Sequence, residues 1–118
     1  MPKRILIAED DVETKGLLAL IATRHGYNVA TVSDGVELLA IVANEKFDVI
    51  ITDIKMPHLN GASAAEIMKM NGYAIPVIAL TAFNYNELDL VKDKFTKVFH
   101  KPCDVSELFK YVESLIGR

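Results

Sequence analysis

Five polar side chains that could bind a cation or take part in group transfer follow short apolar segments of this sequence: Glu9, Asp10, Asp53, Thr81 and Lys101. Carboxylates held close to one another repel, so they either take up protons or are held together by a cation. Ligands that are all oxygens favour a hard cation. Mg²⁺ suits such a site because it binds one or two carboxylates and keeps waters and phosphate oxygens in its remaining positions.

A carboxylate can also act as the nucleophile toward phosphorus, which gives an acyl phosphate. A metal ion and a lysine would then neutralise the charge on the transferred oxygens, and a hydroxyl group would hydrogen-bond one of them. Asp53, Lys101 and Thr81 supply the nucleophile, the ammonium and the hydroxyl. These residue types indicate Mg²⁺-dependent phosphoryl transfer, provided that the fold brings them together.

The elements that must position these residues alternate along the chain. Short β-branched runs alternate five times with longer segments in which apolar residues recur at helical spacing. We expect strands at residues 4–8, 28–32, 47–52, 76–80 and 97–100. The first, third and fourth are continuously apolar, as in strands with helices on both faces, so they should be central. The second alternates and the fifth is very short, which places both at the edges.

Parallel strands of an α/β sheet bring their carboxyl ends to one edge, where ligands bind. The acidic pair, Asp53, Thr81 and Lys101 all come at expected strand ends. We therefore expect their side chains to converge on a single site.

Helix starts are indicated by an Asp or Asn that is followed three residues later by Glu. This pattern occurs at Asp34, Asn84 and Asp104, in register with apolar residues at helical spacing such as Leu17 in the first helix. Asp11 is expected to cap that first helix rather than to bind a metal ion.

Composition limits the classes of function. The 118 residues suffice for one domain, spanning residues 1–118, and not for a second core. The chain is 51% hydrophobic and 25% charged with a formal net charge of -3, which provides neither a basic surface for nucleic acid nor an apolar surface for a membrane. The apolar runs have strand length and the N-terminus lacks a signal-peptide pattern, so we expect a cytoplasmic protein. The single cysteine, Cys103, fits a reducing compartment.

Four motifs, in this order, resemble the receiver domain of two-component response regulators. They are the acidic-pair strand at residues 4–11, the segment from Asp53 through Met56 and Pro57 to Gly61, the fourth strand at residues 75–82, and Lys101-Pro102. Each motif alone is weak, but all four with near-family spacing are specific and cover essentially the whole chain. The resemblance implies a flavodoxin-like, doubly wound (βα)5 three-layer sandwich whose five-stranded parallel sheet has the order 2-1-3-4-5.

The resemblance also implies a role for each acidic residue. Asp53 would accept a phosphoryl group from a sensor histidine kinase or a histidine phosphotransfer protein, in a reaction that needs Mg²⁺. Asp10 would bind the ion directly, together with Asp53 and the main-chain carbonyl of Lys55, and Glu9 would bind it through water.

The basic and hydroxyl residues complete the implied site. Thr81 and Lys101 would hold the phosphoryl group, and the Lys101-Pro102 peptide bond would be cis. Such a domain is a signalling phosphoacceptor rather than an enzyme with turnover. It assists its own phosphorylation and dephosphorylation, and it switches a surface that contacts an effector domain or an output protein.

The chain departs from the family at the expected switch. Three residues before Lys101 the family usually has an aromatic residue, and here that position is Val98. Phe99 is adjacent but should face the other way, because side chains alternate along a strand. We hypothesise that Thr81 still moves toward the phosphoryl group. The helix from Asn84 and the fifth strand would then answer with a smaller or different rearrangement.

A second hypothesis concerns the mouth of the site. Lys55 and Phe83 are expected on its opposite lips, where they could shield the acyl phosphate from water.

Several alternatives stay open at the level of sequence. They are a receiver that only docks partners without phosphorylation, an FMN-binding flavodoxin-like protein, and an aspartyl-phosphate hydrolase or mutase. The acidic pair would repel an FMN phosphate, and the hydrolases and mutases carry their nucleophile on the first strand rather than the third. The kinase, the output, dimerisation through the last helix and strand, and whether the regulator stands alone or belongs to a longer protein also stay open.

Overall fold

Strands and helices alternate along the described part of this computed structural model, residues 2–82 and 85–118. The elements are β1 (Arg4–Ala8), α1 (Val12–Arg24), β2 (Asn28–Val32), α2 (Gly35–Val42), β3 (Val49–Thr52), α3 (Gly61–Met70), β4 (Val77–Thr81), α4 (Tyr85–Asp89), the 3₁₀-helix η1 (Lys92–Lys94), β5 (Lys97–His100) and α5 (Val105–Ile116). Phe83 and Asn84, which carry two of the sequence predictions, lie outside the described residues.

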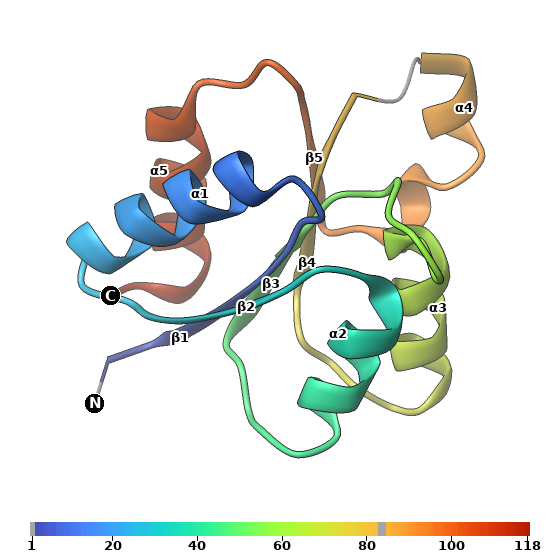
Figure 1. Cartoon of the computed structure of the whole chain (residues 1–118), viewed down its shortest axis with the longest axis horizontal. Helices are drawn as coiled ribbons and strands as arrows, with labels where there is room; N and C mark the ends of the chain where they lie inside the picture. Colours follow the sequence, from blue (N-terminus) through green and yellow to red (C-terminus); the bar gives the residue numbers. More distant parts are fainter. Residues whose placement is uncertain (1, 83–84) are drawn as a thin grey trace.

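The strands form one parallel sheet with the order β2-β1-β3-β4-β5, which confirms the predicted topology and the two predicted edge strands. Helices α1 and α5 cover one face of the sheet, and α2 and α3 cover the other (Figure 1). This arrangement is the predicted three-layer sandwich. It leaves the carboxyl ends of β1, β3, β4 and β5 along one edge, where the site residues lie.

Strand β1 shows why the apolar run is continuous. Ile5 and Ile7 pack in the cluster that includes Leu108 and Phe109 of α5, whereas Leu6 packs in the cluster on the other face of the sheet. All three β1 side chains are fully buried. Burying each such side chain contributes about 1.5–3 kcal/mol, so both faces hold the central strands in place.

Side-chain caps begin four of the helices. Asp11, Asp34 and Asp104 accept hydrogen bonds from the backbone N–H groups of Thr14, Glu37 and Ser106, as the sequence predicts. Asn60 caps α3, since its side chain accepts a hydrogen bond from the N–H of Ser63 at 2.8 Å. In the sequence, the Asn60-Gly61 dipeptide indicates a turn at this place. The cap of α3 therefore lies at the end of the loop that connects β3 to α3 and that begins with Asp53.

The structure corrects three details of the sequence prediction. β3 begins at Val49 rather than residue 47, because Phe47 is buried by packing in a loop and not by strand pairing. β4 runs over Val77–Thr81, which includes Thr81 in the strand. Leu17, one of the apolar residues at helical spacing that indicate the first helix, is 52% exposed, since the buried side of α1 is formed by Leu18 and Ala22.

The Asp34 carboxylate gives the first testable prediction. The backbone N–H of Glu37 and the ring of His58, whose Nδ1 lies 2.7 Å from Oδ2, together lower the pKa of Asp34. A lowered pKa in the folded state stabilises the protein above the ordinary Asp pKa of about 3.9, and this stabilisation is lost as the pH falls through the lowered value. We expect Asp34→Asn to be less stable than the wild type at neutral pH, with the difference shrinking below about pH 4.

Urea unfolding at a series of pH values measures this difference. His58→Gln is the matched variant, and it should lose less than Asp34→Asn because the Glu37 N–H is the larger cause of the shift. A stability difference that stays constant down to acidic pH would contradict the prediction.

Candidate functional site

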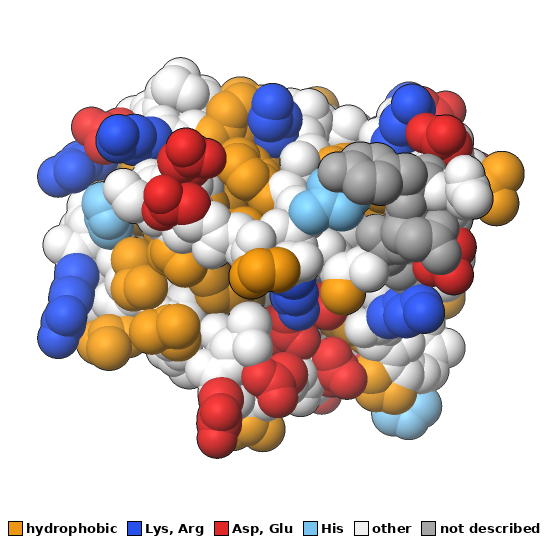
Figure 2. Space-filling model, turned by 90° about the horizontal axis from the view of Figure 1, so that it is seen from above, with side chains coloured by type: hydrophobic (Ala, Val, Ile, Leu, Met, Phe, Trp, Pro, Cys, Tyr) orange, Lys and Arg blue, Asp and Glu red, His pale blue; other side chains and the backbone are white. Residues whose placement is uncertain are grey.

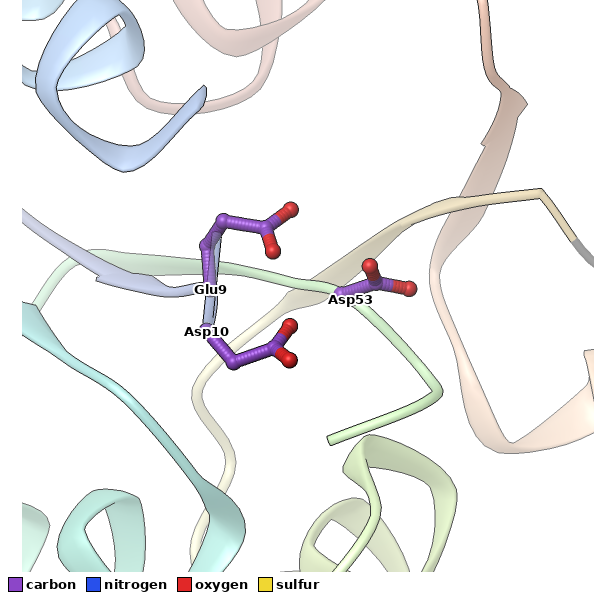
Figure 3. A group of neighbouring side chains, drawn as sticks. All are labelled: Glu9, Asp10 and Asp53. Atoms are coloured by element: carbon purple, nitrogen blue, oxygen red, sulfur yellow. The ribbon is translucent and has the colours of Figure 1, made fainter. Parts of the chain in front are cut away.

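Three carboxylates meet at the edge where the strands end. Ala8 pairs with Thr52 across β1 and β3, so the next residues, Glu9 and Asp53, leave the sheet side by side. The backbone N–H of Asp53 donates to the Ala8 carbonyl at 3.0 Å, which continues the pairing to the site. Carboxylate oxygens of Glu9, Asp10 and Asp53 lie within 4.8 Å of one another, and the Glu9 and Asp10 side chains extend toward the side on which Asp53 lies (Figure 3).

Lys101, which follows β5, reaches two of these carboxylates. Its Nζ lies 2.6 Å from Oε1 of Glu9 and 2.8 Å from Oδ2 of Asp53. Its backbone N–H donates to the carbonyl of Thr81 at 2.7 Å, so the fully buried Thr81 is held beside it. The structure thus brings together the five residues from which the sequence argument starts.

Burial within this cluster is graded. Glu9 is 2% exposed, the Asp53 side chain is 11% exposed, and Asp10 lies at the surface. Acidic side chains gather in the lower middle of the molecular face seen from above, with basic side chains beside them (Figure 2). The Asp10 carboxylate is therefore solvated, whereas the buried Glu9 carboxylate obtains its hydrogen bonds from the protein.

The charges of Glu9 and Lys101 depend on each other. Burial raises the pKa of Glu9, against the lowering effect of hydrogen bonds from Lys101 and from the Asp11 backbone. Burial alone would lower the pKa of Lys101, but the bonds and charges of Asp53 and Glu9 outweigh it and raise that pKa. The ammonium therefore stays charged beside the Asp53 carboxylate.

The donor set fits Mg²⁺. Carboxylate oxygens of three residues lie close together, and Lys101 Nζ contacts two of these residues, Glu9 and Asp53. Carboxylates held this close repel one another, and a divalent cation would balance their charge. An open hollow of about 580 Å³ lies beside them, lined by Asp10, Lys55, Met56, Pro57 and Asn60. Asp10 and Lys55 both line this hollow, and the role of the Lys55 carbonyl as a metal ligand stays a prediction. Its openness leaves room for the waters and phosphate oxygens that Mg²⁺ keeps.

A family model described as "response regulator receiver domain" matches residues 5–113 of the chain. The chain belongs to this family. Receiver domains are signalling domains of two-component systems, and the family assignment favours this interpretation over the flavodoxin-like and hydrolase alternatives. The Lys101-Pro102 peptide bond of this receiver domain is cis, as the resemblance implies.

Two curated relatives show the range of the family. The response regulator MprA of Mycobacterium sp. (strain KMS) is 35% identical over 100% of this chain and 52% of its own length. This receiver domain thus spans about half the length of the mycobacterial regulators it matches. Sporulation initiation phosphotransferase F of Bacillus subtilis is 31% identical over 92% of this chain and 89% of that protein.

Two solved structures are similar in fold. The receiver domain of a sensor histidine kinase from Pseudomonas aeruginosa has a TM-score of 0.90 and 26% identity, with 100% of both chains covered, and contains a magnesium ion coordinated in its active-site cleft. The response regulator TrrA of Thermotoga maritima, in complex with Mg²⁺ and BeF, has a TM-score of 0.88 and 28% identity over 96% of this chain and 98% of that one.

Val98, at the predicted switch position, is turned inward. Val98 packs against the small buried cluster that includes Ile54, Ala79 and Leu88. Phe99 lies on the other face, with its ring centroid 5.9 Å from that of Tyr111, as the alternation of the strand predicts. The proposed roles of Thr81 and Val98 in switching stay predictions, as does the shielding by Lys55, since its partner lies outside the described residues.

Sequence reasoning did not predict two close approaches to the Asp53 backbone, by Thr52 and by Gly61. The hydroxyl of Thr52 donates to the main-chain carbonyl of Asp53 at 2.8 Å. Gly61 approaches the same carbonyl so closely that a Cβ atom there would collide with its oxygen. A glycine directly after the loop that follows Asp53 is a signal of close approach, but the Thr52 contact has no signal in the sequence.

Proposed function

We propose that this domain accepts a phosphoryl group on Asp53 from the phosphohistidine of a sensor histidine kinase or a histidine phosphotransfer protein, in a Mg²⁺-dependent reaction. The observation that carries the proposal is the contact of Asp53 Oδ2 with Lys101 Nζ at 2.8 Å inside a cluster of carboxylates. A nucleophilic carboxylate, an ammonium group and a cation site thus lie within one cluster.

In the transfer, a carboxylate oxygen of Asp53 bonds to phosphorus while the phosphorus–nitrogen bond to the donor imidazole breaks. The electron pair of that bond stays with the imidazole. Lys101 neutralises charge on the transferred oxygens, and the Thr81 hydroxyl donates a hydrogen bond to one of them. Asp10, Asp53 and the carbonyl of Lys55 would hold Mg²⁺, which would neutralise further charge on these oxygens.

Glu9 has a different part in this proposal. Its carboxylate accepts from Lys101 at 2.6 Å and from the backbone N–H of Asp11 at 3.0 Å. These bonds use both of its oxygens, which supports a contact with Mg²⁺ through water rather than a direct one. Glu9 thus holds the ammonium group in place beside Asp53.

The phosphorylated form has a signalling role. The domain comprises residues 1–118, and its phosphorylation switches a surface that contacts an effector domain or an output protein. The domain assists its own phosphorylation and dephosphorylation and has no substrate turnover of its own. We place it in the cytoplasm, where kinase and phosphate donor are found. Within the described ranges, no helix combines the length and the apolar character needed to span a membrane.

Mass spectrometry after incubation with acetyl phosphate tests the proposal. We expect the wild type to gain one phosphoryl group in the presence of Mg²⁺ and none when a chelator removes the ion. Asp53→Asn should gain none, and Asp10→Asn should gain it much more slowly. Asp89→Asn, at an exposed position of α4, is the matched control and should behave as the wild type. An Asp53→Asn protein that still becomes phosphorylated would refute the assignment of the phosphoacceptor, and an unmodified wild type would favour the receiver that only docks partners.

A further inference from the structure

Thr52 is the last residue of β3 and is fully buried, although its side chain is polar. Its hydroxyl donates a hydrogen bond of 2.8 Å to the main-chain carbonyl oxygen of the next residue, Asp53. A buried hydroxyl and a carbonyl oxygen each lose free energy when they have no partner, so this bond satisfies both groups.

The carbonyl that Thr52 holds belongs to the peptide unit between Asp53 and Ile54. The N–H of the same unit donates to Oδ1 of Asp53 at 2.6 Å. A peptide unit is planar, and its C=O and N–H point in opposite directions. The hydrogen bonds to this C=O and from this N–H therefore fix the orientation of the whole unit. Thr52 thereby fixes the direction in which the Ile54 N–H points at the Asp53 carboxylate.

The second oxygen of that carboxylate is held from another element. Oδ2 of Asp53 contacts Lys101 Nζ at 2.8 Å. Oδ1 and Oδ2 thus have different partners, one from the local backbone and one from the residue after β5. The rotation of the carboxylate is set by both, and a turn of the 53–54 peptide unit would release the first of them.

The start of α3 closes this arrangement. The N–H of Gly61 donates to the carbonyl of Ile54 at 2.8 Å, and a Cβ atom at Gly61 would lie 3.0 Å from Oγ1 of Thr52. The Thr52 hydroxyl is therefore enclosed between β3 and α3. Little space remains in which another group could replace its hydrogen bond.

We infer that Thr52 is a positioning residue for phosphoryl transfer, which acts by holding the 53–54 peptide unit so that the Asp53 carboxylate presents one defined oxygen to phosphorus. This inference rests on the proposed function of Asp53. A carboxylate that rotates freely spends less time in a geometry suited to attack, so loss of the Thr52 donor slows the transfer.

The test compares Thr52→Val, which removes the donor, with Thr52→Ser, which keeps it. We expect Thr52→Val to lower the rate constant of phosphorylation by acetyl phosphate roughly three- to tenfold, in line with the loss of one hydrogen bond, and Thr52→Ser to stay within about twofold of the wild type. Thr31→Val, at an exposed position of β2, is the control for the substitution itself. Rates are compared at a temperature where all variants are folded.

The Ile54 amide proton provides a readout that a general loss of stability does not move. Its chemical shift reports the bond to Asp53 Oδ1, and it should move in Thr52→Val and remain in Thr52→Ser. Equal rates together with an unmoved Ile54 amide would overturn the inference. If the wild type itself is not phosphorylated, the proposed function fails, and the Ile54 amide alone decides the role of Thr52. If Thr52→Val does not fold, Thr52→Ala against Thr52→Ser gives the same comparison.

Discussion

Lys101→Met is expected to slow phosphorylation by acetyl phosphate about 10²- to 10³-fold, the usual cost of removing one charged or hydrogen-bonding group that stabilises a transition state. The ammonium group lies 2.8 Å from Asp53 and 2.6 Å from Glu9, where the transferred oxygens would gather negative charge. Methionine keeps an unbranched apolar side chain of similar length, so the variant removes the charge with little change in packing. Reactions that are quenched at a series of times and analysed by mass spectrometry give the rate constants.

The same variant should bind Mg²⁺ more tightly than the wild type. Lys101 and the cation would share the Asp53 carboxylate. Removing the ammonium group removes its repulsion of the cation and leaves the negative charge of the carboxylates without that partner. Since the chain has no tryptophan, a Mg²⁺ titration is better followed by amide chemical shifts or calorimetry than by tryptophan fluorescence. Tighter cation binding with slower transfer would separate the two roles of positive charge at this site.

Lys97→Met is the matched control, because Lys97 lies in β5, at an exposed position. It should change neither the phosphorylation rate nor the affinity for Mg²⁺. A Lys101→Met protein that is phosphorylated at the wild-type rate would show that the ammonium group is a structural partner of Glu9 and takes no part in the transfer.

The fold was predictable because continuous apolar runs indicate burial directly. Strand β1 has such a run, which is not expected on a solvated face, and the full burial of Ile5, Leu6 and Ile7 confirms the prediction. Element boundaries were less predictable. Phe47 is as apolar as a strand residue, yet it is buried by tertiary packing outside β3, which a local pattern does not distinguish from strand pairing.

The candidate site was predictable to the extent that topology determines it. Once the strands are parallel, the residues after β1, β3 and β5 come at the same edge of the sheet, and Glu9 and Asp53 follow neighbouring strands. β4 lies between β3 and β5, so the contact of Lys101 with Asp53 also depends on the length of the lysine side chain. The contacts of Thr52 and Gly61 with the Asp53 carbonyl are different, because they depend on how the loop between β3 and α3 returns to the sheet. That return is a property of the folded loop and leaves only a weak trace in the sequence.

Gly61→Ala is expected to destabilise the domain by about 3 kcal/mol, the upper end of the usual cost of overpacking a closely fitted region. A Cβ atom at this position would collide with the main-chain carbonyl oxygen of Asp53, which belongs to the backbone and cannot rotate away. Gly61 has no positive φ, so the clash and not the backbone conformation is the reason. Urea unfolding followed by circular dichroism measures the change.

Gly16→Ala is the matched control with the opposite expected sign. Gly16 lies inside α1 with no atom near the position of its Cβ, so alanine should stabilise the domain by about 0.5–1 kcal/mol through its higher helix propensity. Gly61 also begins a helix, and propensity alone would predict a gain there too. A lower free energy of unfolding for Gly61→Ala together with a higher one for Gly16→Ala would thus isolate the contact with Asp53. Slower phosphorylation of Gly61→Ala would show that α3 sets the position of the phosphoacceptor backbone. A gain at both positions would mean that the loop relaxes at no cost and that the close approach has no role.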